Sequence, residues 1–186
     1  MEGMAVAQKW TVEGPVDEET PVVNFHFQAP VDYYAGEITS LSGSLDLSSG
    51  SSLNNAKGAF TIAANSLTMG DKMMDESIMK MIKATEFPSP KFTFESIDVQ
   101  ENAELSFGIL SQFSVAGSLE LKGISKPIGV VAQIMPVLNE HGEPRLEVFA
   151  SFTLRLKDNY DINGPDGPSP ANDTMEFYLN FLMKPR

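Results

Sequence analysis

Apolar residues stand at every second position over much of this chain, and this alternation limits the fold more than any other feature. The longest example runs from Leu146 to Leu156, where the residues between the apolar positions are mostly polar or charged. Successive side chains of a β-strand point to opposite faces, so such a stretch has one face for a core and one for solvent. Other stretches share the pattern, namely 9–12, 22–28, 41–47, 60–64, 92–94, 113–121, 128–134 and 175–183. The pattern predicts an all-β protein of about eight strands.

The stretch 115–128 is typical of two strands joined by a tight turn. Apolar and polar residues alternate before the turn, with Gly117 among the apolar positions. Gly123 provides the backbone freedom that a tight turn needs. Pro127 stands at the edge of the returning strand, where its missing N–H costs little. Such a hairpin places two antiparallel strands side by side in one sheet.

One segment has the period of a helix instead. Four apolar residues fall on one helical face: Met74, Ile78, Met81 and Ile82. We expect a short helix over residues 75–83, capped at its start by Asp75 and ended by Phe87-Pro88. Methionines cluster in and before this segment, and methionine suits both an ordinary core and an adaptable apolar surface. The helix is therefore either plain core or a lid on a cavity.

Chain length and charge limit the number of domains and the kinds of partner. With 186 residues, the chain suits a single domain, which we place at residues 9–186. We expect residues 1–8 to be a flexible tail or the remnant of an export leader, because Ala5-Val6-Ala7-Gln8 has the small-residue pattern that ends such a leader. The formal net charge of −12 repels nucleic acid and anionic membrane surfaces. No apolar run approaches the roughly 20 residues that span a bilayer.

Few residues of this chain are suited to catalysis or to metal binding. It has no cysteine, which excludes disulfides, thiolate catalysis and cysteine-ligated zinc. Its two histidines, His26 and His141, stand on the polar face of a strand and in a turn, and they form no triad pattern. Acidic residues of the long loop 157–173 match no calcium-loop spacing: Asp158, Asp161, Asp166 and Asp173. We expect no catalytic residue, no metal and no cofactor.

Long antiparallel strands with one apolar face can close into a barrel. At eight strands, the interior is either filled by side chains or has room for one ligand. Small residues at inward positions help to leave room: Ala64, Gly117, Ala132 and Ala150. We therefore expect an eight-stranded antiparallel β-barrel, with the short helix covering one end. A two-sheet sandwich with a solid core is the structural alternative.

Four stretches, in order along the chain, resemble signatures of the YceI-like, polyisoprenoid-binding family of bacterial proteins. They are Trp10 with Val12, the predicted helix with the following Phe87-Pro88 and Phe92-Thr93-Phe94, the hairpin 115–128, and the segment 156–162. The resemblance extends from Trp10 to Lys184. Three positions depart from the family pattern. Ser77 stands where the family helix has a histidine, Asp161 stands where the family has a glycine, and Arg155 lies only near the position of an arginine.

The resemblance implies a lipocalin-like barrel with a long interior pocket for isoprenoid or similar amphiphilic chains. It also implies a periplasmic or secreted protein. On this basis we expect non-enzymatic binding or transport of such a lipid, with hydrophobic or amphiphilic small molecules as partners and a homodimer left open. The competing hypotheses are a solid-core adhesion or structural module and, as a weaker alternative, a small-molecule enzyme on a barrel scaffold.

The expected lipid-binding residues are the apolar residues that face the barrel interior or belong to the helix stripe. They are Phe25, Phe27, Leu45, Phe60, Ile62, Met74, Ile78, Met81, Ile82, Phe92, Phe94, Phe113, Val115, Leu119, Val130, Val148, Ala150, Phe152, Leu154, Phe177 and Leu179.

Overall fold

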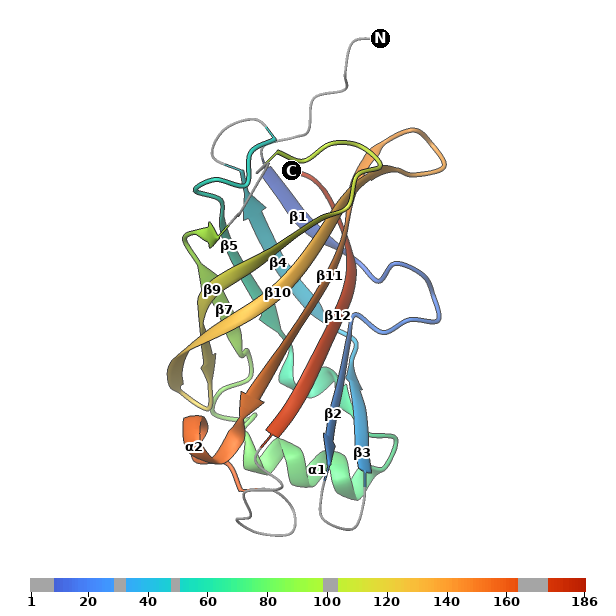
Figure 1. Ribbon diagram of the computed structural model, residues 1–186. Helices are drawn as coiled ribbons and strands as arrows, with labels where there is room; N and C mark the ends of the chain where they lie inside the picture. The colour runs from blue at the N-terminus through green and yellow to red at the C-terminus, as the bar shows by residue number, and fades with distance from the viewer. Residues whose placement is uncertain (1–8, 29–32, 48–50, 99–103, 164–173) are drawn as a thin grey trace.

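A closed antiparallel β-barrel forms the body of the protein. The computed structural model describes residues 9–28, 33–47, 51–98, 104–163 and 174–186, so the predicted tail 1–8 lies outside the described residues. Going around the barrel, the strands are β1 (Lys9–Gly14), β4 (Leu41–Asp46), β5 (Lys57–Ile62), β7 (Lys91–Phe94), β9 (Ser111–Leu121), β10 (Ile124–Leu138), β11 (Pro144–Arg155) and β12 (Thr174–Pro185). Strand β12 pairs with β1 and closes the sheet (Figure 1). This closure confirms the predicted barrel and excludes the two-sheet sandwich.

The barrel wall is extended at one end by two further strands. The last residues of β12 pair with β1, and its first residues pair with β2 (Val23–Gln28), so β1 and β2 together flank one long strand. Strand β3 (Tyr33–Ile38) pairs with β2, and only its last two residues also pair with β6 (Leu67–Thr68) in the described part of the chain. A short strand β8 (Ile97–Asp98) adds to β9. The wall is therefore incomplete beside β3, at the end where α1 (Lys72–Met81) lies (Figure 1).

The hairpin between β9 and β10 has the tight turn that the sequence predicts. Leu121 pairs with Ile124, and the two residues between them, Lys122 and Gly123, have φ angles of 56° and 73°. Positive φ at both central residues is typical of the two-residue turn that matches the twist of antiparallel strands. The turn fixes the register of β9 and β10, two long neighbouring strands of the barrel.

Helix α1 begins three residues before the predicted start, and the predicted cap is wrong. The carboxylate of Asp71 accepts a hydrogen bond from the Met74 N–H at 3.0 Å, so Asp71 is the cap. The carboxylate of Asp75 instead accepts from the Met69 N–H at 2.6 Å and from the Thr68 hydroxyl at 2.8 Å. Both aspartates suit a helix start, and the contact with the preceding segment decides between them. These two hydrogen bonds of Asp75 hold the first turn of α1 against the end of β6.

Removing the cap is expected to loosen α1 without unfolding the barrel. Asp71→Ala leaves the Met74 N–H in the first turn without its acceptor, which costs about 1 kcal/mol. Hydrogen exchange of the α1 amides should become about fivefold faster, with exchange in β9 to β11 unchanged. Glu76→Ala, on the exposed face of the same helix, is the matched control. Equal exchange rates in Asp71→Ala and Glu76→Ala would contradict this role of Asp71.

A second helix, α2 (Leu156–Tyr160), follows β11 where the sequence predicts the end of a strand and the start of a loop. Helix α2 ends at Asp161, which has a left-handed backbone with φ of 50°. Glycine adopts this conformation most readily and aspartate tolerates it, so Asp161 fits the place of the family glycine. The Lys122 ammonium donates to the Asp161 carbonyl at 2.8 Å, and the Tyr160 hydroxyl donates to the Leu119 carbonyl at 3.1 Å. These bonds fasten α2 to the β9–β10 hairpin.

Raising the pH is expected to weaken the fold through Tyr160. Burial raises the pKa of this phenol from 10.0 to about 12. The unfolded chain therefore ionises before the folded one, so the contribution of Tyr160 is fully present below pH 10.0 and is lost as the pH rises towards 12. Urea unfolding across this range measures the loss. Tyr160→Phe should show a shallower fall than the wild type, and parallel curves would contradict the assignment.

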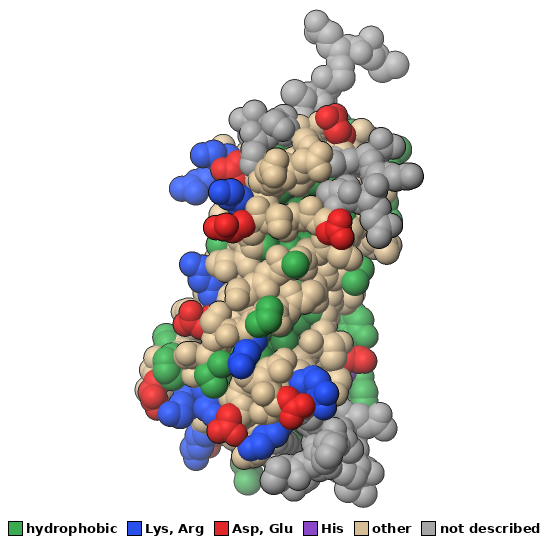
Figure 2. Space-filling model, turned by 60° about the vertical axis from the view of Figure 1, so that its left-hand side comes forward, with side chains coloured by type: hydrophobic (Ala, Val, Ile, Leu, Met, Phe, Trp, Pro, Cys, Tyr) green, Lys and Arg blue, Asp and Glu red, His purple; other side chains and the backbone are tan. Residues whose placement is uncertain are grey.

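The end of the barrel remote from α1 is filled by side chains. Trp10, Leu47, Leu53 and Leu146 are fully buried there, and none of them lines a cavity. On the outer face that carries β5, β7 and β9, most of the surface is uncharged polar side chains, glycine and backbone, and charged groups gather mainly towards the two ends (Figure 2). The space inside the barrel that side chains leave empty therefore lies between the Trp10 end and α1.

Candidate functional site

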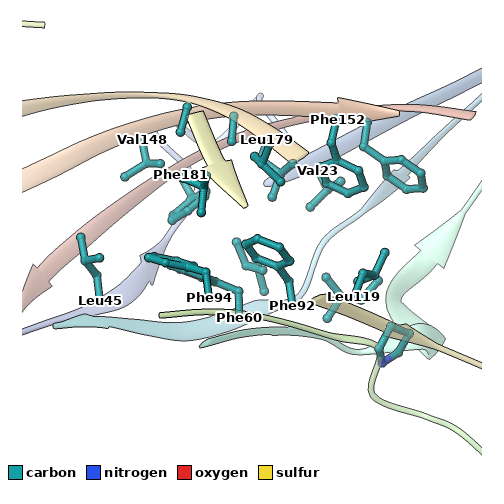
Figure 3. A pocket seen from close by; sticks show the side chains of 18 of the residues that line it. Val23, Leu45, Phe60, Phe92, Phe94, Leu119, Val148, Phe152, Leu179 and Phe181 are labelled. Atoms are coloured by element: carbon teal, nitrogen blue, oxygen red, sulfur yellow. The ribbon is translucent and has the colours of Figure 1, made fainter. Parts of the chain in front are cut away.

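The larger cavity lies in the middle of the barrel and has a volume of about 150 Å³. Strands β2 to β5 and β7 to β12 contribute its lining, and every lining residue in the described part of the chain is apolar. Phe60, Phe92 and Phe94 stand on one side, opposite Val148, Leu179 and Phe181 (Figure 3). The alternation of β4, β5 and β9 to β12 turns one side chain in two towards this space.

A smaller cavity of about 70 Å³ lies beneath α1 and α2. The end of α1 covers it with Ile78, Met81 and Ile82, which confirms that this helix covers one end of the barrel. Within the described ranges, its one polar lining residue is Asn163, which is exposed and so marks where the cavity approaches the surface. The two cavities adjoin, because they share five lining residues: Ile38, Ile62, Pro90, Leu121 and Phe177.

The structure brings almost all of the predicted site residues to these cavities. The larger cavity is lined by Leu45, Phe60, Ile62, Phe92, Phe94, Phe113, Val115, Leu119, Val130, Val148, Ala150, Phe152, Leu154, Phe177 and Leu179. The smaller cavity is lined by Phe25, Phe27, Ile78, Met81 and Ile82, and also by Ile62 and Phe177. Met74 lines neither cavity. It is half-buried in the first turn of α1, on the same helical face as Ile78 but one turn before it, and only the later residues of that face reach the cavity.

Other lining residues were not among those predicted. The alternation itself could have found Val23, Leu41, Leu121, Ala132, Ile134, Phe181 and Met183, which share faces with predicted residues. Ile38 and Ile97 stand in short strands, and Leu156 and Ile162 stand in and after α2, none of which the sequence pattern revealed. Ala64 and Met175 stand at the ends of the alternating stretches 60–64 and 175–183, and Leu67, Pro90 and Asn163, outside those stretches, complete the set.

Four small residues were expected to leave room inside the barrel, and three of them line a cavity. Ala132 and Ala150 line the larger cavity, and Ala64 lines the smaller one. Gly117 leaves no empty space, because a Cβ atom at this position would lie 2.3 Å from the Phe92 ring. The ring of Phe92 therefore occupies the room that Gly117 provides.

The ionisable residues discussed above lie outside both cavities. The His26 ring stacks on Tyr33 and meets the edge of Tyr178 on the outer face of β2, and His141 stands in an exposed turn. Asp158 pairs with Arg155 at 3.0 Å, and Asp161 pairs with Lys157 at 2.8 Å. Asp166 and Asp173 lie outside the described residues. Within the described ranges, no group of acidic or histidine side chains has the arrangement of a metal site.

The position of the family histidine is also remote from the cavities. Ser77 is exposed on α1, whereas Ile78 beside it is buried and lines the smaller cavity. Arg155 is exposed at the end of β11. The departures at these two positions therefore leave the apolar lining unchanged. Neither helix in the described part of the chain has the length and apolar character of a membrane span.

Comparison with solved structures shows the same fold in bacterial proteins of low sequence identity. A polyisoprenoid binding domain from Saccharophagus degradans, implicated in plant cell wall breakdown, has 12% identity and a TM-score of 0.71, with 97% of this chain and 100% of that chain covered. Burkholderia cenocepacia BcnA has 14% identity and a TM-score of 0.66, with coverage of 86% and 94%. The Campylobacter jejuni YCEI protein has 15% identity and a TM-score of 0.66, with coverage of 90% and 91%.

No curated protein matches the chain. The family model of the YceI-like domain matches residues 15–181, which includes every strand from β2 to β11, both helices and most of β12. The match agrees with the closed eight-stranded barrel and with the resemblance in the sequence. The chain therefore belongs to the YceI-like domain family.

Proposed function

We propose that this protein binds the chain of an isoprenoid-type or similar amphiphilic lipid inside the barrel, and that it holds or carries this lipid without chemical change. The observation that carries the proposal is the pair of adjoining cavities, whose only polar lining residue among those that the structure describes stands at the surface. An apolar chain gains roughly 0.8 kcal/mol for each methylene-sized group that leaves water. The lining thus favours an apolar chain over any polar substrate. Its lack of ionisable groups supports binding without catalysis.

The geometry supports entry from the α1 end. The opposite end is filled by Trp10 and its buried neighbours. The smaller cavity lies nearest to the exposed residue Asn163 and leads to the larger one. A chain that enters here places its apolar tail in the barrel and leaves its head group near Asn163. Apolar burial then selects the tail, and the head group contributes little to recognition.

The size of the cavities implies that side chains turn when a long chain binds. The larger cavity, at about 150 Å³, has the size of an engineered apolar cavity that binds benzene. A longer chain must pass the residues shared by the two cavities. Phe177 is one of them, and its ring stacks on Phe152 with centroids 4.8 Å apart. Movement of this pair joins the two spaces into one channel.

A solved structure supports the kind of ligand proposed here. One solved structure of the same fold is described as a polyisoprenoid binding domain. We also propose a periplasmic or secreted location, since a carrier of this kind suits a compartment between membranes. A homodimer stays a prediction that the mass of the native protein will test.

The proposal is tested by extracting the protein with organic solvent after purification without detergent and analysing the extract by mass spectrometry. Wild-type protein should release isoprenoid lipids enriched over the host extract. Phe177→Trp enlarges the ring between the cavities and should release little, whereas Tyr178→Trp, one residue away and exposed, should resemble the wild type. Equal amounts in all three proteins, or only bulk phospholipid, would contradict the proposal.

A further inference from the structure

Phenylalanine rings on the inner wall lie close against glycines of the neighbouring strands. The four pairs are Phe25 on Gly36, Phe60 on Gly43, Phe94 on Gly58 and Phe92 on Gly117. A Cβ atom built on any of these glycines would lie between 2.2 and 2.5 Å from a ring carbon. Real Cβ atoms do not approach other atoms below 3.0 Å. Each ring therefore keeps its position against the wall only because its partner has no side chain.

The glycines thereby control how much of the interior the rings occupy. Phe94 is paired with Gly58 across β5 and β7, and a ring that cannot lie over the opposite backbone must turn towards the barrel axis. Phe94 lines the larger cavity, on the side of Phe92 that faces Leu45 and the filled end (Figure 3). Phe25, paired with Gly36, lines the smaller cavity under α1. The two pairs thus stand at different depths from the proposed entrance.

On the basis of the proposed lipid binding, we propose that the Gly58–Phe94 pair sets the length of chain that the barrel accepts. A methyl group at position 58 displaces the Phe94 ring into the inner part of the larger cavity and shortens the space beyond Phe92. The Gly36–Phe25 pair sets the width of the passage under α1, which every chain must cross. Glycine at position 58 is thus a specificity-determining residue, although it need not touch the lipid.

At two of the four glycines, an alanine would meet only side-chain rings and no backbone atom. At Gly43 and Gly117 a Cβ atom would also lie 2.6 Å from a backbone oxygen, so alanine there would distort the strands. At Gly36 the close atoms all belong to the Phe25 ring, and at Gly58 they belong to the rings of Phe94 and Phe60. Gly129, exposed on β10 with no atom within 4 Å of an added Cβ, is the matched control.

The test measures the affinity of the whole protein for geraniol, farnesol and geranylgeraniol by calorimetry. Gly58→Ala should bind the longest alcohol about tenfold more weakly, because about two methylene-sized groups lose their place, and should bind geraniol nearly as the wild type does. Gly36→Ala should weaken binding of all three alcohols. Gly129→Ala should match the wild type. Gly58→Ala combined with Phe94→Leu, which shortens the displaced ring, should restore the longest alcohol.

Several results would overturn the inference. A folded Gly58→Ala variant with an unchanged length profile excludes a role for the pair in length selection. If Gly58→Ala fails to fold and Phe94→Leu does not rescue it, ring displacement is not the cause. A wild-type protein that binds none of the alcohols overturns the proposed function, and this inference with it. If the wild-type protein binds the alcohols and Gly58→Ala has the same dependence of affinity on chain length, this inference is overturned and the proposed function stands.

Discussion

Phe152→Asp is expected to abolish lipid binding and to destabilise the barrel severely. Phe152 lines the larger cavity and stacks on Phe177 with an interplanar angle of 9°. Removing a buried phenylalanine ring costs about 3–5 kcal/mol, and an unpaired carboxylate in an apolar interior adds to that cost. Because the free energy of unfolding of a domain is about 5–15 kcal/mol, the substitution removes a large part of that stability.

Urea unfolding and binding of a fluorescent polyene lipid measure the two effects. Ser151→Asp adds the same charge one residue away on the outer face and should change stability by less than about 1 kcal/mol. Phe152→Leu removes the ring but keeps an apolar side chain, so it should fold and bind. Because protonation removes the charge, Phe152→Asp should recover stability as the pH falls. Stable folding of Phe152→Asp near neutral pH, with binding intact, would place Phe152 away from the lipid.

The double substitution of Met81 and Ile82 by alanine is expected to speed lipid release by tenfold or more. Both side chains cover the smaller cavity from the end of α1. The hydrogen bonds of Asp75 fasten the start of the helix, whereas its end is held against the barrel chiefly by apolar contacts around Ile78. Removing several buried methylene-sized groups weakens that contact by more than the roughly 1.4 kcal/mol that corresponds to a tenfold change in rate.

The rate at which a polyene lipid is released into vesicles, measured by stopped flow, tests whether α1 acts as a lid. Met73→Ala is the control on the same helix, because Met73 is 80% exposed and lines neither cavity. Circular dichroism should show the barrel intact in both variants. Release rates that match the wild type in a folded double variant would show that α1 is plain core and that lipid enters elsewhere.

Long strands with one buried face could be predicted because burial imposes the period on the sequence. Strands β9 to β12 each run for 11 to 15 residues, and their inward residues line the larger cavity as expected. All eight phenylalanines expected to face inward line one of the two cavities: Phe25, Phe27, Phe60, Phe92, Phe94, Phe113, Phe152 and Phe177. For these residues the pattern alone specified the face.

The short elements β3 and α2 could not be predicted, because tertiary contacts decide them, whereas the apolar stripe of α1 revealed that helix to within a turn. Gly36 breaks the apolar alternation of β3, and the ring of Phe25 on the opposite strand takes its place. Leu156 continues the alternation of β11, yet it is buried as the first residue of α2. In the first case the partner lies on the adjacent strand, and in the second Leu156 packs with Leu119 and Leu121 of β9, so neither outcome follows from the local pattern. The glycine–phenylalanine pairs are likewise visible only once the strand register is known.

The central claim is that a lipid chain lies inside the barrel, and nuclear Overhauser effects between bound farnesol and the protein test it most directly. Selectively labelled phenylalanine rings report on Phe92, Phe152 and Phe177, which line the larger cavity. The claim predicts contacts between the methyl groups of farnesol and these rings, with the hydroxymethyl end nearest to Asn163. Contacts only with exposed apolar residues such as Leu138 and Ile109, and none with the three rings, would contradict it.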